Sequence, residues 1–167
     1  MAATYEPIAT TTLGSASGSI TFSSIPATYT DLVLICQVKR TSGGAEIWAR
    51  VNSDTSSNYS FTYLYGTGSA TGSGRTSNET NGLFFGVTGN NDFGTFILHL
   101  QNYANTTTYK TGISRFSVAN PVTNYQAVGA NVALWRSTSA VTSLTVRDAG
   151  STYVAGSTFT LYGIASA

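Results

Sequence analysis

Apolar and polar residues alternate along most of this chain. Near the C-terminus, Leu144 and Val146 alternate with polar residues, and after a glycine-containing loop Phe159 and Leu161 do so again. A period of two places the apolar side chains on one face of an extended strand. Each such strand needs a second layer over its apolar face, so we expect a chain built from them to fold as a sandwich or barrel.

The same pattern recurs along the chain and predicts about ten strands. They are expected at residues 19–22, 31–39, 46–52, 58–66, 81–87, 94–101, 110–118, 125–136, 141–148 and 157–164. The segment 31–39 begins apolar on both faces, which predicts a central strand. No window shows the period of a helix, and no strict repeat suggests a β-helix or propeller. We therefore expect an all-β fold, a single-domain antiparallel β-sandwich with a jelly-roll-like topology.

The first part of the chain is predicted to lie outside this domain. Residues 1–17 are too polar and glycine-rich for a helix and are expected to form an extended N-terminal arm or edge strand, with the sandwich domain over 18–167. Pro7 lacks an N–H donor, which disfavours a place inside a sheet. The residues expected to order on a neighbouring protein are Tyr5, Glu6, Pro7 and Ile8.

An aromatic stripe marks the segment 58–66, where alternation places Tyr59, Phe61, Tyr63 and Tyr65 on one side of a strand. Either these rings cover the edge of the core with their hydroxyls in water, or they stack on sugar rings or on a partner protein. We therefore take the three tyrosines as candidate partner-binding residues. The loop Gly66–Gly74 that follows lacks both the lysine and the helix of a phosphate-binding loop, and it is expected to be a flexible tip.

The composition describes a nearly neutral, hydroxyl-rich surface. Charged residues make up only 9% of the chain and the formal net charge is +1, while 27 Thr and 21 Ser supply the polarity. A surface with so little field is not suited to nucleic acid, and no stretch is long and apolar enough for membrane insertion. No signal peptide is recognisable, so synthesis in the host cytoplasm is expected. Cys36, the only cysteine, lies in an apolar run and is expected in the core.

Few residues could carry out a reaction. His99 is the only histidine, which disfavours a transition-metal site, and a Ser-His-Asp triad around it would be a chance match in so serine-rich a chain. The seven acidic residues mostly adjoin turns, where carboxylates cap backbone amides. We therefore predict no catalytic residues, no metal ligands and no cofactor, and we do not expect an enzyme.

Several segments resemble the small β-rich virion proteins of tailed bacteriophages, especially cyanophage-like ones. The segments that carry this resemblance are Tyr5–Leu13, Ile20–Leu32, Asn102–Thr107, Leu134–Thr138 and Gly156–Ile164. The last of them is also similar to the ends of some tail-fibre chains. The resemblance implies a structural protein located in the virion, and it implies no reaction.

Within that family, the expected role is a capsid decoration or cement protein that stabilises the particle by protein-protein contacts. The expected partners are further copies of the chain, as a homotrimer, and other virion proteins such as the major capsid protein. The alternative is a tail-fibre or tail-appendage module that binds a host-surface glycan. A glycan hydrolase would require two carboxyl groups across one cleft.

Overall fold

The computed structural model describes residues 4–89, 92–120 and 125–165, and these residues form strands and no helix. The twelve strands of the described part are β1 (Tyr5–Thr12), β2 (Ser19–Phe22), β3 (Asp31–Val38), β4 (Ala45–Val51), β5 (Tyr59–Gly66), β6 (Thr71–Glu79), β7 (Leu83–Thr88), β8 (Gly94–Gln101), β9 (Lys110–Asn120), β10 (Tyr125–Trp135), β11 (Leu144–Asp148) and β12 (Thr158–Ile164).

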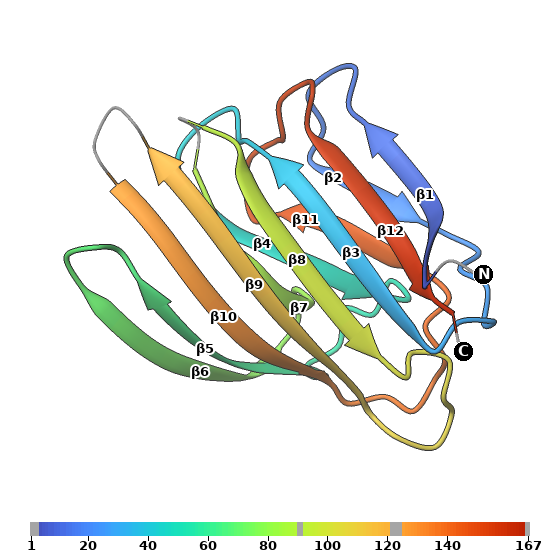
Figure 1. Cartoon of the computed structure of the whole chain (residues 1–167). Coiled ribbons are helices and arrows are strands. Elements are labelled where there is room, and N and C mark those ends of the chain that lie inside the picture. The colour runs from blue at the N-terminus through green and yellow to red at the C-terminus, as the bar shows by residue number, and fades with distance from the viewer. Residues whose placement is uncertain (1–3, 90–91, 121–124, 166–167) are drawn as a thin grey trace.

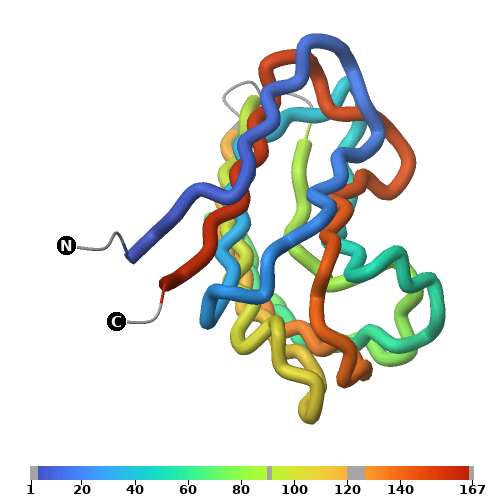
Figure 2. The backbone as a smooth tube through the Cα atoms, turned by 90° about the vertical axis from the view of Figure 1, so that its right-hand side faces the viewer, coloured from blue at the N-terminus to red at the C-terminus, as the bar shows by residue number. Residues whose placement is uncertain are grey.

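The strands form two antiparallel sheets that face each other (Figures 1 and 2). The large sheet has eight strands in the order β1-β12-β3-β8-β9-β10-β5-β6, and the small sheet has four in the order β2-β11-β4-β7. From β2 onward the chain passes repeatedly from one sheet to the other, as in a jelly roll. The prediction of an antiparallel β-sandwich is confirmed, and the central place expected for residues 31–39 is confirmed by β3, which lies between β12 and β8.

Alternation explains how the two sheets pack. In β8, Phe96, Leu98 and Leu100 are buried between the sheets, while the residues between them point to the other side. In β4, Ile47 and Val51 lie on the same face by alternation and are completely buried. Cys36 lies in the same core, and burial raises the pKa of its thiol well above the usual value. The core is therefore a continuous layer of aliphatic and aromatic side chains between the sheets.

Strand β6 corrects the prediction of a flexible tip at Gly66–Gly74. Only the turn at its start is a loop, closed by a 2.8 Å hydrogen bond from Thr67 N to Ala70 O. From Thr71 onward the segment pairs with β5, although glycine and serine are poor strand formers. The missing side chains are replaced by the tyrosine rings of β5, which lie over the glycines of β6 and supply the cross-strand packing.

The N-terminal segment also lies in a sheet. Strand β1 is the edge of the large sheet and pairs with β12, with an irregularity between Pro7 and Ala9. An edge position tolerates proline because one side of the strand needs no ladder hydrogen bond. The start of β1 and the end of β12 lie side by side (Figure 2), and Ala165 N donates to Thr4 O at 3.1 Å.

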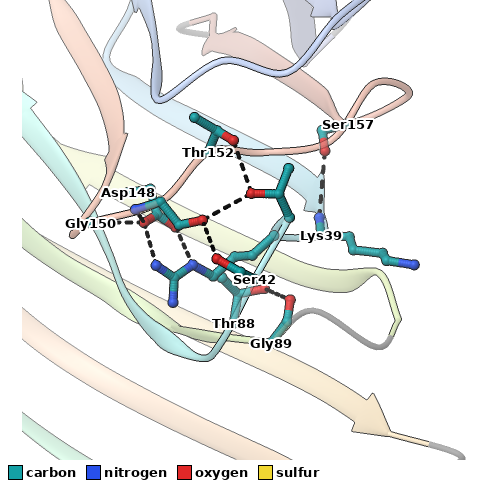
Figure 3. Close-up of polar contacts among 11 residues, drawn as sticks. Lys39, Ser42, Thr88, Gly89, Asp148, Gly150, Thr152 and Ser157 are labelled. Atoms are coloured by element: carbon teal, nitrogen blue, oxygen red, sulfur yellow. Dashed lines mark hydrogen bonds and ion pairs between the residues drawn. The ribbon is translucent and has the colours of Figure 1, made fainter.

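A buried ion pair connects the start of the β3–β4 turn to the end of β11 (Figure 3). Arg40 and Asp148 are each only 5% exposed, and two pairs of their atoms lie 2.7 Å apart. Asp148 Oδ1 also accepts hydrogen bonds from the backbone N–H groups of Gly150 and Ser151. Removal of the Asp148 carboxylate would break all of these contacts. The positive charge of Arg40 would then stay buried without a partner.

We therefore predict that Asp148→Ala lowers the free energy of unfolding by about 3–5 kcal/mol. The exposed carboxylate of Asp92 provides the control, and Asp92→Ala should change stability by less than about 1 kcal/mol. Urea denaturation followed by tryptophan fluorescence measures both variants. Equal losses in the two variants would contradict the structural role of the pair.

Candidate functional site

The side of the large sheet that faces away from the small sheet, called here the outer face, carries apolar residues and no covering layer among the described residues. Its most exposed aliphatic side chains are Val128 (63%), Leu64 (60%), Val132 (54%) and Ile113 (52%). They come from the neighbouring strands β5, β10 and β9. Their neighbours in sequence, such as Ala127 and Ala133, point inward and are buried.

The strand register brings these aliphatic residues together. Val132 lies directly opposite Ile113, and Ala130 lies between Leu64 and Arg115. Further toward the centre of the sheet, Ile97 of β8 and Ile35 of β3 continue the apolar surface and are half-buried. A contiguous apolar area on the surface of a sheet is a common mark of an interaction site.

A second feature lies at the other side of the same strands. An open cleft of about 360 Å³ lies where the hairpin β5–β6 meets the edge strand β7 of the small sheet. This tyrosine cleft is lined by Glu46, Phe61, Tyr63, Tyr65, Thr76, Phe84, Val87 and Phe116.

The rings of the tyrosine cleft form a ladder that runs from the core to solvent. Phe61 stacks on Phe84 with ring centroids 4.7 Å apart, and Tyr63 lies 5.8 Å from Phe84. Tyr65 follows at 6.2 Å from Tyr63, with the two rings only 23° from parallel. The exposed fraction rises from 9% at Phe61 to 36% at Tyr65. The outer rings of the ladder are thus both fixed by packing and open to solvent.

Tyr59 does not belong to this surface, although the sequence suggested it as a partner-binding residue. It is completely buried, and its hydroxyl lies in contact with the backbone of Val51 and of Asp54 instead of water. Burial raises the pKa of Tyr59 to about 12. Because β5 begins beneath the turn that follows β4, its first aromatic ring is enclosed and only the later rings reach the surface.

The predicted arm residues are held by the chain's own sheet. Tyr5 is 54% exposed and packs edge-to-face on Tyr162, with ring centroids 6.1 Å apart. Pro7 is exposed, whereas Glu6 and Ile8 are half-buried and Ile8 packs against the core. Binding of a partner by these four residues stays a prediction, and it would have to use the face or the open edge of β1.

The acidic residues act mainly as caps, as the sequence suggested. Glu79 accepts hydrogen bonds from the N–H groups of Thr80 and Asn81, and Asp92 from that of Phe93. Asp31 accepts from Asn102 N at 2.8 Å and also lies 3.1 Å from His99 Nε2. In the described ranges, no serine hydroxyl hydrogen bonds to His99 and no group of three His, Cys, Asp or Glu side chains could hold a metal ion.

Asp54 is held by three hydrogen bonds from two parts of the chain. It accepts hydrogen bonds from Ser56 N (2.8 Å), Asn58 Nδ2 (2.9 Å) and Trp135 Nε1 (2.7 Å). Burial disfavours its charge, but the hydrogen bonds outweigh burial and lower the pKa of Asp54 to about 2. This carboxylate joins the β4–β5 turn to the end of β10.

Comparison with models of known protein families, with curated proteins and with solved structures finds no match to this chain. Among the described residues, no helix has the length and apolar character needed to cross a membrane.

The lowered pKa of Asp54 predicts acid sensitivity. Its stabilising effect should be complete above the ordinary value of 3.8 and should disappear as pH falls through the folded value of about 2. We expect Asp54→Asn to lower the melting temperature at pH 7 and to reduce the further loss between pH 4 and pH 2. Thermal melts of both proteins across that range provide the measurement, and parallel curves would contradict the assignment.

Proposed function

We propose that this chain is a structural protein of a tailed-bacteriophage virion that acts by adhesion and not by turnover. The observation that carries the proposal is the outer face, a broad sheet surface with four aliphatic side chains more than half exposed. The phage-like sequence segments support the virion assignment. The capping role of most acidic residues is consistent with a protein that carries out no reaction.

The outer face has the dimensions of a protein interface. Eight strands about 4.8 Å apart, each about eight residues long, give a face of about 900 Å². A stable protein-protein interface buries about 800 Å² per partner. Apolar residues of β5, β9 and β10 form much of the face, with Arg115 among them, and a low net charge adds little repulsion between copies. The partner that fits this surface best is a neighbouring copy of the same chain.

Within the virion, we propose that the protein decorates or cements the capsid as a homotrimer that contacts the major capsid protein. Each contact with the capsid can then be weak, because the binding free energies of several contacts add up to a stable attachment. A place in a tail appendage is the second candidate, and the specific observation in its favour is the tyrosine cleft.

The location is tested by cryo-electron microscopy of whole particles together with mass spectrometry of the purified virion. Density for this two-sheet fold on the capsid surface would support decoration, and density on a tail structure would support the second candidate. Absence of the chain from purified particles would refute the virion assignment.

The role of the outer face is tested by Val132→Lys. A lysine among the aliphatic residues of this face should weaken self-association at least tenfold, since about 1.4 kcal/mol corresponds to a factor of ten. The measurement is the molar mass by light scattering over a concentration series. Because Val132 is 54% exposed, the variant should retain the β-sheet circular dichroism spectrum.

The matched control is Thr21→Lys, which adds the same charge to an exposed β-branched position in strand β2 of the small sheet. Its assembly state should equal that of the unmodified protein. If the protein is monomeric at all concentrations, or if both variants associate equally, the outer face is not the interface between copies.

A further inference from the structure

We propose that the tyrosine cleft binds a neutral pyranose glycan, with the sugar ring stacked on Tyr63 and Tyr65. This inference goes beyond the structural role proposed above. It rests on the geometry of the cleft alone, and it holds wherever the chain is located in a particle.

The first argument is the orientation of the two tyrosine rings. Tyr65 lies opposite Gly72 and Tyr63 opposite Gly74 in the register of β5 and β6. A methyl group on Gly72 would lie 2.8 Å from the ring of Tyr65, and one on Gly74 would lie 2.7 Å from the hydroxyl of Tyr63. The rings therefore lie against the backbone of β6, and their opposite faces are the ones available to the cleft.

The second argument is that the two rings are nearly parallel and already ordered. The ring centroids of Tyr63 and Tyr65 lie 6.2 Å apart with their planes 23° from parallel, and Phe84 of strand β7 in the small sheet packs on Tyr63. A flat aromatic surface fits the C–H face of a pyranose ring. A quaternary ammonium group is instead bound by rings that surround it on several sides. Because packing fixes the rings before binding, little conformational entropy is lost on association.

The third argument is the polar rim of the cleft. Glu46 is exposed and its carboxylate makes no hydrogen bond or ion pair with the described residues, while Thr76 adds a hydroxyl from β6. A carboxylate accepts hydrogen bonds from two hydroxyl groups at once, which suits the neighbouring hydroxyls of a sugar. The same negative charge repels sulfated, phosphorylated or sialylated glycans. The cleft therefore favours neutral glycans.

The test uses the full chain on an array of neutral hexose and N-acetylhexosamine oligosaccharides, with sialylated glycans, sulfated glycans and phosphocholine as comparison probes. The expected result is binding to at least one neutral glycan and not to the comparison probes. Calorimetric titration with the best neutral glycan then gives the affinity of each variant. No binding to any neutral glycan, or binding to phosphocholine alone, would overturn the proposal.

The variants separate stacking from loss of fold. Tyr65→Ala should weaken binding at least tenfold, whereas Tyr65→Phe keeps the ring and should stay within about threefold. Glu46→Ala removes an exposed side chain without disturbing the core and should also weaken binding at least tenfold. Tyr109→Ala is the matched control, because Tyr109 is 55% exposed and does not line the cleft.

Unchanged affinity in both Tyr65→Ala and Glu46→Ala would overturn the proposal, whatever the array shows. The result is independent of the outer face, since Val132→Lys should leave glycan affinity unchanged. A chain that assembles normally but binds no sugar would refute only the cleft. A chain that binds sugar but is absent from particles would refute only the virion role.

Discussion

The main constraint on this structure is that four strands must cover one face of a sheet made of eight. Apolar side chains on the inner side of the large sheet have to be buried, yet the small sheet ends at β7, before the large sheet does. The hairpin β5–β6 extends past that margin, and its aromatic rings close it by packing on Phe84 and Trp48. The aromatic ladder thus covers the part of the large sheet that the small sheet does not reach. The tyrosine cleft is the part of this margin that stays open to solvent.

On the outer face of the large sheet, no layer of the described residues covers the apolar side chains. Most antiparallel sheets that face water on one side carry polar residues there. Here Leu64, Val128, Val132 and Ile113 take those positions, and the surface has few charges to interrupt them. The same broad sheet therefore presents two different surfaces, an exposed aliphatic one on its outer face and an aromatic cleft on its inner side.

Strong alternation made much of the fold predictable. Segments such as β8 and β4 have one clearly apolar face, so their existence and their inward residues follow from the sequence. Strand β6 could not be found in this way, because its packing comes from the tyrosines of β5 and its own glycines carry no pattern. Tyr59 was misjudged for a related reason: its burial depends on the turn that covers it, which is not visible in the aromatic stripe. The outer face could not be told from the sequence either. Strand β10 carries apolar residues on both faces, such as the exposed Val128 and the buried Ala133, and the same pattern is found in strands that are buried on both sides.

The order of strands also determines when this protein can form. Strand β12, the last of the described strands in chain order, lies between β1 and β3, which are among the first. Strand β1 therefore has no neighbour to pair with until β12 has been synthesised, and only then can all eight strands of the large sheet pair. A chain that stops before β12 leaves β1 and β3 without the strand that joins them, so the large sheet stays unfinished.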